Sequence, residues 1–215
     1  MRVNHEARAA AAESRRAQTR ARLIEAAMTV IAEKGPEASS IEDFVAAAGV
    51  SRGTFYNYFP THEDLLHALN TEISEALDKT LEPVRSGMDD PAVLLATVVH
   101  RILAAFVLDP VRAWLALKFE AMAIPRQAVF EARFDAIYSA AVATGRFRHC
   151  EVAAARNLVF GGFRMGQRDI ALGEVGPEHA VDLVALMLIA LGLTPAEATQ
   201  ISRDAFEAAR LALVT

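Results

Sequence analysis

The apolar residues of this chain recur every three or four positions, the spacing that places them on one face of an α-helix. The first clear stripe consists of Leu23, Ala27, Val30 and Ile31. A longer stripe follows at Leu65, Leu69, Ile73, Leu77 and Leu81. No segment alternates apolar and polar residues in the way of a half-buried strand. The pattern therefore predicts an all-α protein.

Eight prolines mark the boundaries of these helices, because proline is tolerated in the first turn of a helix and costs about 3 kcal/mol in its interior. Two short helices are expected, one over 41–48 and one from Ser51 to about Tyr58; Ser40 and Asp43 are placed for a capping box at the start of the first. A long linking helix is expected over 62–82. The remaining helices are expected at about 91–108, 111–123, 126–144, 151–172, 178–192 and 196–212.

These segments divide into an N-terminal three-helix helix-turn-helix domain over 19–62 and a larger helical bundle over 63–215. Residues 1–18 precede both and are expected to form a flexible basic arm, since six arginines lie within residues 1–22 against Glu6 and Glu13. Two interpretations of the arm stay open. It is either a disordered solubilising tail or an element that tracks the DNA backbone or reaches a minor groove.

Composition narrows the class of protein. With 53% hydrophobic residues the chain has enough apolar side chains for a folded core, and its 43 alanines favour closely packed helices. The formal net charge of −5 argues against a protein that coats nucleic acid nonspecifically. The single cysteine, Cys150, excludes an internal disulfide and a cysteine-cluster zinc site. We expect no metal ion and no cofactor.

The sequence also indicates where the protein resides. The first 20 residues lack the apolar core of a signal peptide. The most apolar stretch, 183–196, is uncharged for 14 residues, which is shorter than the ~18 apolar residues of a membrane span. We therefore expect a cytoplasmic protein with no membrane association.

Residues 40–62 carry the pattern of a helix-turn-helix, two short helices joined by a tight turn at Gly49. The 19 residues between Asp43 and Glu63 contain no carboxylate, although the chain as a whole is acidic. A surface that approaches phosphates is expected to lack acids, because each would repel the DNA backbone. The alternative is a solvated, aromatic-rich turn that packs on the other helices, and we assign Phe44, Phe55 and Phe59 to that core.

The stretch from Thr19 to Leu69, about a quarter of the chain, resembles the DNA-binding domain of tetracycline-repressor-type (TetR family) regulators. The most specific part of the match is the run Ala48-Gly49-Val50-Ser51-Arg52-Gly53-Thr54-Phe55-Tyr56. The resemblance implies a homodimer in which the third helix of each subunit enters one major groove of a palindromic operator. It also implies a C-terminal domain that dimerises and binds a small-molecule effector.

The candidate DNA contacts combine polar side chains of the turn and third helix with cations nearby. His62 stands where the family usually has a phosphate-binding lysine. Of the two tyrosines, we expect only Tyr56 to point fully outward. The complete set is Arg20, Arg22, Ser40, Ser51, Arg52, Gly53, Thr54, Tyr56, Asn57, Tyr58 and His62.

Candidate effector contacts lie on the C-terminal helices, where large or polar side chains interrupt apolar segments. They are His100, Trp114, Met122, Phe134, Tyr138 and Arg164. For each of the large side chains, the alternative is an ordinary core residue. An alanine-lined, aromatic cavity would suit a flat apolar effector.

The expected dimer face combines closely spaced glycines with an apolar stripe, which together allow helices to approach each other. It consists of Gly161, Gly162, Gly166, Val184, Leu188 and Leu191. The alternative is packing within one subunit.

The sequence thus predicts a ligand-responsive transcriptional repressor that releases its operator when a small, largely apolar effector binds. The alternative is an α-helical metabolite-binding protein or an enzyme with a helix-turn-helix-like N-terminus. The sequence contains no metalloprotease, phosphate-loop or paired Glu-x-x-His motif, so we do not expect an enzyme. An architectural DNA protein is disfavoured by the acidic composition.

Overall fold

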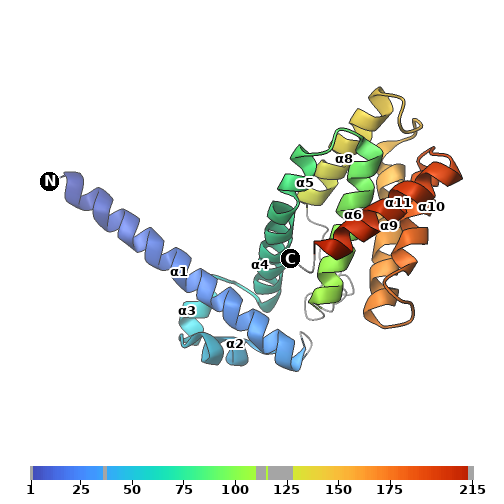
Figure 1. The fold of residues 1–215 in the computed structure, drawn as a ribbon. Helices are drawn as coiled ribbons and strands as arrows, with labels where there is room; N and C mark the ends of the chain where they lie inside the picture. The colour runs from blue at the N-terminus through green and yellow to red at the C-terminus, as the bar shows by residue number, and fades with distance from the viewer. Residues whose placement is uncertain (1, 36–37, 110–114, 116–127, 213–215) are drawn as a thin grey trace. The chain divides into compact units, whose positions relative to one another are not determined.

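The computed structural model describes residues 2–35, 38–109, 115 and 128–212, and every element with defined bounds in this part of the chain is a helix (Figure 1). The N-terminal helices are α1 (Arg2–Lys34), α2 (Ile41–Ala48), α3 (Arg52–Tyr56) and α4 (His62–Thr80). They are followed by α5 (Glu82–Ser86), α6 (Pro91–Leu108), α8 (Ala128–Ala143), α9 (Val152–Ala171), α10 (His179–Ala190) and α11 (Pro195–Leu211). The all-α prediction is confirmed. The helix expected at 111–123 falls outside the described residues except at Leu115.

The chain forms two compact units, Met1–Glu72 (unit 1) and Ile73–Thr215 (unit 2). The division falls inside α4, ten residues beyond the boundary expected at 62/63. The first half of α4 therefore belongs to the core of unit 1. The expected linking helix over 62–82 ends at Thr80, and the short helix α5, with proline in its first turn, follows.

The core of unit 1 forms where the apolar stripe of α1 meets phenylalanines of α2 and α3 and leucines of α4. Its fully buried large side chains are Leu23, Ile24, Ile31, Phe44, Phe55, Leu65, Leu66 and Leu69. Helix α2 begins with the expected capping box, in which the Ser40 side chain accepts from the Asp43 amide and the Asp43 side chain accepts from the Ser40 amide. Helix α2 packs on the longer α1, and α3 packs on α2.

The N-terminal arm differs from the expectation of a flexible tail. Residues 2–18 are the first part of α1, a single helix of 33 residues that extends beyond α2 and α3 (Figure 1). Residues 8–18 are exposed, so this part of the helix is not held by packing. Its physical support is local, because alanine has the highest helix propensity and the run Ala9–Ala12 is uninterrupted.

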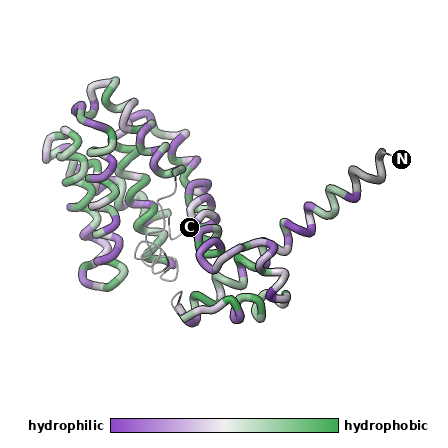
Figure 2. Tube along the Cα trace, turned by 180° about the vertical axis from the view of Figure 1, so that it is seen from behind, coloured by the Kyte–Doolittle hydropathy of each residue, from purple (hydrophilic) through white to green (hydrophobic). Residues whose placement is uncertain are grey.

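Unit 2 is a bundle in which α6, α8, α9, α10 and α11 share one hydrophobic core. Hydrophobic residues recur along these helices (green in Figure 2), as the apolar spacing of the sequence predicts. Among the described helices, α6 alone is long and apolar enough to cross a membrane. It packs against α8, α9, α10 and α11, and we interpret it as the central helix of the bundle.

Tyr138 illustrates how polar groups are satisfied inside this core. Its side chain is 3% exposed, and its hydroxyl accepts from the Cys150 amide at 2.8 Å and lies within hydrogen-bonding distance of the carbonyl oxygens of Arg148 and Cys150. The hydroxyl thus holds the loop between α8 and α9 against α8. Burial is the main cause that raises the pKa of this phenol.

We expect Tyr138→Phe to lower the free energy of unfolding of unit 2 by about 1–3 kcal/mol, because the buried amide of Cys150 loses its partner. Urea unfolding followed by the fluorescence of Trp114, the single tryptophan, measures the change. Tyr56→Phe, at an exposed tyrosine, is the control and should leave the midpoint almost unchanged. An equal stability of Tyr138→Phe and the unmodified protein would contradict this role.

Candidate nucleic-acid interface

The turn between α2 and α3 is formed by Gly49, which adopts the left-handed conformation with φ 63° and ψ 40°. A residue with a side chain is strained in this conformation, whereas glycine adopts it freely. The Gly49 amide donates to Ala46 O at 3.2 Å, and the Val50 amide donates to Val45 O at 3.0 Å. The chain therefore reverses within two residues and presents α3 beside α2.

Two arginines of α1 have partners inside unit 1. Arg22 donates to the carbonyl oxygen of Ala48, the last residue of α2. Arg20 pairs with Glu72 at 2.8 Å, and its guanidinium lies 5.6 Å from the centroid of the Phe59 ring. The sequence predicted both as DNA contacts. In the structure these contacts tie α1 to α2 and α4. Both members of the Arg20–Glu72 pair are partly exposed, so Arg20 can exchange Glu72 for a phosphate, and the DNA contacts of both arginines stay predictions.

Ser51 begins α3 in the manner the sequence predicts. Its side chain accepts from the Thr54 amide at 3.0 Å and forms a second hydrogen bond with the Thr54 hydroxyl at 2.8 Å. This N-cap satisfies one of the first-turn amides that have no partner inside the helix. Ser40 has the same role at α2, so both serines predicted as DNA contacts are engaged in capping.

The exposed side of α3 carries Arg52, Gly53, Tyr56 and Asn57, while Phe55 faces the core. Arg52 pairs with Glu42 of α2 at 2.7 Å, and its Nη2 donates to the Tyr56 hydroxyl at 3.3 Å. Both members of the ion pair are largely exposed, and a pair in water contributes little to stability. Arg52 can therefore exchange this partner for a phosphate at small cost.

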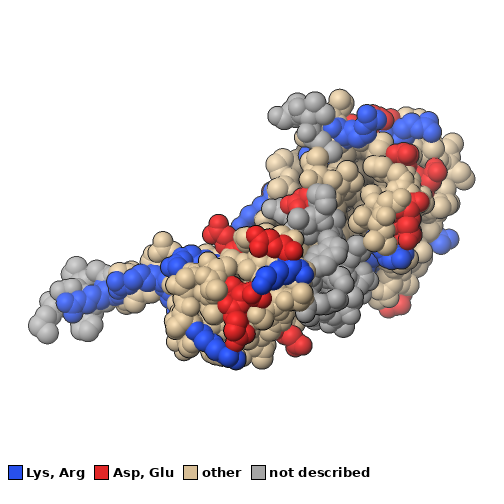
Figure 3. All heavy atoms as spheres, turned by 90° about the horizontal axis from the view of Figure 1, so that it is seen from below, with Lys and Arg blue, Asp and Glu red and all other residues tan. Residues whose placement is uncertain are grey.

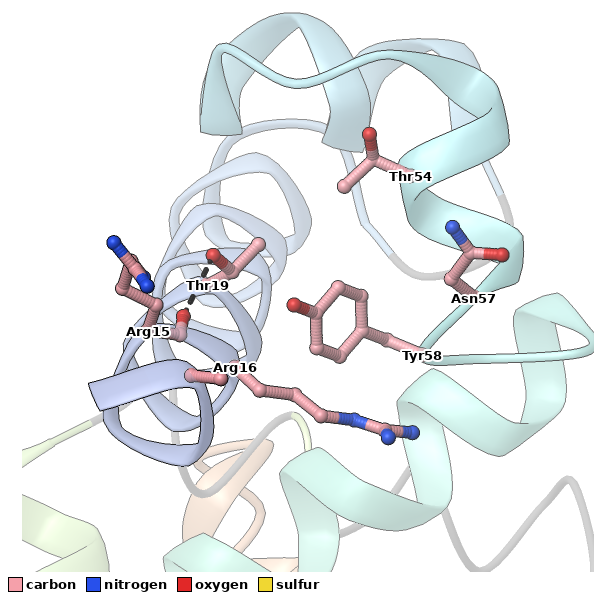
Figure 4. Close-up of a pocket in the computed structure, with 7 residues that line it drawn as sticks. Arg15, Arg16, Thr19, Thr54, Asn57 and Tyr58 are labelled. Carbon is pink, nitrogen blue, oxygen red and sulfur yellow. Dashed lines mark hydrogen bonds between the residues drawn. The ribbon is translucent and has the colours of Figure 1, made fainter. Parts of the chain in front are cut away.

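The two tyrosines are placed as expected. Tyr56 is 42% exposed on the outer side of α3, whereas Tyr58 is half-buried. The Tyr58 ring points toward α1 (Figure 4). The guanidinium of Arg16 lies 5.9 Å from the centroid of this ring, a cation–π contact.

His62, predicted as the replacement for a phosphate-binding lysine, is placed differently. Its ring stacks on Phe44 with centroids 5.3 Å apart and an interplanar angle of 9°. Its Nε2 atom is buried and has no hydrogen-bond partner among the described residues. Burial lowers the pKa of His62, opposed in part by Glu63. The ring is thus a neutral packing group against α2 rather than a cation presented outward.

A polar groove lies between the exposed part of α1 and α3, with a volume of about 560 Å³ (Figure 4). Its lining residues are Ala12, Arg15, Arg16, Thr19, Thr54, Asn57 and Tyr58. The Thr19 hydroxyl donates to Arg15 O at 3.0 Å. The groove brings three predicted DNA contacts, Thr54 of α3 and Asn57 and Tyr58 directly after it, together with three residues that the prediction missed, Arg15, Arg16 and Thr19.

The spacing of α1 could have revealed these residues. Arg8, Ala12, Arg15 and Thr19 recur at intervals of three or four and share one side of the helix, with Arg16 beside them. At 100° per residue Glu13 lies about 120° around the helix from Thr19, outside this stripe. Lys and Arg side chains follow the helical arm (blue in Figure 3). The groove is therefore the basic side of the arm, facing the polar side of α3.

Unit 2 places the candidate effector residues in different settings. His100 lines a cavity of about 320 Å³, whereas Phe134 and Tyr138 are core residues stacked on one another and do not line it. Arg164 is half-buried on α9 and does not line it either. Trp114 and Met122 lie outside the described residues. Among the four predicted residues that the structure describes, His100 is the one at this cavity.

The expected dimer face is largely internal. A Cβ added to Gly162 or Gly166 would meet side chains of α10, Met187 and Leu183 at the first and Leu183 at the second, so these glycines permit close packing of α9 on α10 within one chain. Val184, Leu188 and Leu191 are buried in the core, 2% exposed or less. Within one chain these residues thus serve internal packing, the alternative that the sequence left open, and the dimer face stays a prediction. Gly161 is exposed, with open space around it.

Comparison with known proteins supports the geometry of unit 1. The model of the family described as "Bacterial regulatory proteins, tetR family" matches residues 23–69. The repressor KstR2 of Rhodococcus jostii is 34% identical over 80 residues, which cover 37% of this chain and 39% of that protein. The repressor LfrR of Mycolicibacterium smegmatis is 36% identical over 67 residues, covering 31% and 34%. The matched segment thus spans less than half the length of these curated relatives.

Solved structures extend the likeness over most of the chain. The structure of RolR in complex with resorcinol is 31% identical, with a TM-score of 0.68, and covers 88% of this chain and 95% of that one. FadR of Bacillus subtilis in complex with stearoyl-CoA shares the fold at 21% identity, with a TM-score of 0.62 and coverage of 78% and 96%. The helix-turn-helix, its groove and these relatives agree: the chain belongs to the tetR family of bacterial regulatory proteins.

Proposed function

We propose that this protein is a cytoplasmic, ligand-responsive repressor, in which unit 1 binds a palindromic operator and unit 2 binds a small, largely apolar effector that releases it. The observation that carries the proposal is the polar face of α3, whose own residues include no carboxylate, beside the basic side of α1. The family membership supports it. We assign the protein no enzymatic activity.

Helix α3 is suited to the major groove by what it exposes. Thr54 and Asn57 line the polar groove and Tyr56 projects from the outer side, so these groups are available to base edges and phosphates. Asparagine can recognise adenine through two hydrogen bonds in the major groove. Gly53 has no side chain at the start of α3, which allows the DNA backbone to approach closely.

Arg15 and Arg16 extend this surface along the DNA backbone. They line the groove shared with α3, so a phosphate chain held there would meet two cations on the α1 side and neutral hydrogen-bonding groups on the other. Cations on a helix beside the recognition helix supply affinity without base preference. This assignment adds Arg15 and Arg16 to Arg20 and Arg22 as the proposed phosphate contacts of α1.

Binding to both halves of a palindromic operator requires two copies of unit 1 and therefore a dimer. Helices α9 and α10 offer a surface for this contact. Exposed apolar side chains recur along α9 at Leu158, Met165 and Leu172, and Leu186 is exposed on α10. Gly161 leaves open space on α9 where another helix can approach. We propose that this set forms the homodimer contact, in place of the buried residues that the sequence favoured. Operator half-sites one helical turn apart would require the α3 helices of the two subunits to lie about 34–36 Å apart.

The effector belongs to unit 2. RolR, similar over nearly its whole length, is a relative whose structure holds the ligand resorcinol. The cavity beside His100, with a volume of about 320 Å³, is at the small end of the range for ligand sites. We therefore favour a small effector over a long-chain one.

Asn57→Ala is expected to weaken binding to the specific operator about 5- to 100-fold, the loss of one bidentate base contact. Affinity for unrelated DNA should change little. Fluorescence anisotropy with DNA from upstream of its own gene, compared with a scrambled duplex, measures both. Gln200→Ala, an exposed amide of α11 in unit 2, is the matched control. An equal loss on both duplexes would show that Asn57 does not read bases.

The double substitution Arg15→Ala/Arg16→Ala should weaken binding to specific and unrelated DNA alike. The slope of log affinity against log salt concentration should become shallower by about 2, since each phosphate contact contributes about 0.9. Arg203→Ala, an exposed arginine of α11, should leave the slope unchanged. An unchanged salt slope in the double variant would show that the arm does not contact DNA.

Met165→Glu and Leu186→Glu, made separately, should convert a dimer into a monomer, because each places a charge within an apolar contact. Light scattering after size-exclusion chromatography at micromolar concentration measures the mass. The control is Leu211→Glu, which alters an equally exposed leucine at the end of α11. An unmodified protein that is monomeric under these conditions would rule out the proposed contact.

A further inference from the structure

A cavity in unit 2 is enclosed by residues of α6, α10 and α11 and by the end of α9 with the loop that follows it. Its walls are mainly apolar: Leu103, Ala104, Val107, Ile170, Pro177, Ala180, Phe206 and Ala209. The two charged side chains that line it, Glu178 and Arg210, are exposed. Arg210 also lies over Phe206 and near Glu207. The cavity is therefore apolar inside, with its charges at the solvent edge.

His100 contributes the polar side chain of the interior. It is 1% exposed, and its ring meets Phe206 edge-on with centroids 5.6 Å apart. Its Nε2 lies 3.0 Å from the Ser202 hydroxyl. Its Nδ1 is buried and has no hydrogen-bond partner among the described residues. A buried polar atom without a hydrogen-bond partner is unfavourable, so this nitrogen is suited to a hydrogen bond with a bound molecule.

The hydrogen bonds around Ser202 determine which ring nitrogen carries the proton. The Ser202 hydroxyl lies 2.7 Å from the carbonyl oxygen of Val181, which can only accept. A serine hydroxyl has one proton and gives it to that carbonyl. It must therefore accept from His100, so Nε2 carries the hydrogen and Nδ1 has the free lone pair.

The ring stays neutral near pH 7. Burial is the main cause that lowers the pKa of His100 to about 4, opposed in part by its hydrogen bond with Ser202. A neutral imidazole with its proton on Nε2 offers Nδ1 as an acceptor only. His100 lines the cavity, so an occupant with a hydrogen-bond donor that reaches Nδ1 would satisfy this atom, while the remaining walls offer mainly apolar contact.

We infer that this cavity binds a small, neutral, hydroxyl-bearing ring compound of the phenol class, whose hydroxyl donates to Nδ1 of His100 while its ring packs on Leu103, Ile170 and Phe206. A phenol combines a strong donor with an apolar ring in one small molecule. The alanines at 104, 180 and 209 leave room for the ring. The inference rests on the proposed function in one respect, that occupation of this cavity is the event that releases the operator.

Binding to the full-length protein tests the donor requirement. Isothermal titration with phenol, anisole and toluene compares molecules that share a ring but differ in the donor. Phenol should bind at least tenfold more tightly than anisole or toluene, because neither can donate to Nδ1. Equal affinities, or tighter binding of benzoate than of phenol, would overturn the inference.

Substitutions locate the site. Ala104→Leu fills the cavity without changing His100 and should abolish phenol binding, whereas Ala208→Leu, at an exposed alanine of α11, should not. His100→Phe should remove the preference of phenol over toluene. Because a change at a buried histidine can prevent folding, NMR of the unmodified protein labelled with ¹⁵N-histidine provides a second measurement. Its Nδ1 resonance at His100 should be that of an unprotonated nitrogen and should shift when phenol is added; a protonated Nδ1, or no shift at saturation, would contradict the assignment.

DNA binding is measured separately, so the cavity inference and the proposed function can each be overturned without the other. Operator binding without phenol binding would overturn this inference and leave the proposed function standing. Phenol binding by a protein that binds no operator would overturn the proposed function and leave the cavity assignment standing. Phenol that binds in the cavity but does not release the operator would contradict the coupling between them.

Discussion

The left-handed turn at Gly49 is the constraint on which the interface of unit 1 depends. It reverses the chain between α2 and α3, so that Phe55 reaches the core while the polar side of α3 stays exposed. Arg22 secures the turn from α1 by binding the carbonyl oxygen of Ala48. The caps at Ser40 and Ser51 then define where each short helix begins. A helix of five residues such as α3 has little stability alone, so its orientation comes from these neighbours.

Much of this architecture could be predicted because it is local. Proline in the first turn and the caps Asp90 and Thr194 fix the starts of α6 and α11, which begin at Pro91 and Pro195. The helix-turn-helix was evident from an acid-free segment and a specific run of residues. The helical arm could also have been predicted, since its alanine run favours a helix. The expectation of a flexible tail gave more weight to the charge of the arm than to its helix propensity.

The tertiary contacts of these residues could not be predicted from their spacing in the sequence. Gly162 and Gly166 signal a close helix contact, yet nothing in the pattern says whether α10 of the same chain or another subunit fills the space. Arg20 and Arg22 look like free cations until Glu72 and Ala48 are placed beside them. The importance of His100 likewise depends on Ser202, 102 residues away, whose own bond to Val181 fixes the proton of the ring.

The extension of α1 beyond the core has a mechanical consequence. Because the packed residues around Leu23 nucleate the helix, the arm needs only propagation, and each added residue contributes its own hydrogen bond. A continuous helix also fixes orientation, since every residue turns the chain by 100° and advances it by 1.5 Å. The direction in which Arg15 and Arg16 project is therefore set by counting residues from the core. One inserted residue between Arg16 and Leu23 would swing both guanidinium groups away from α3, while the core itself stayed intact.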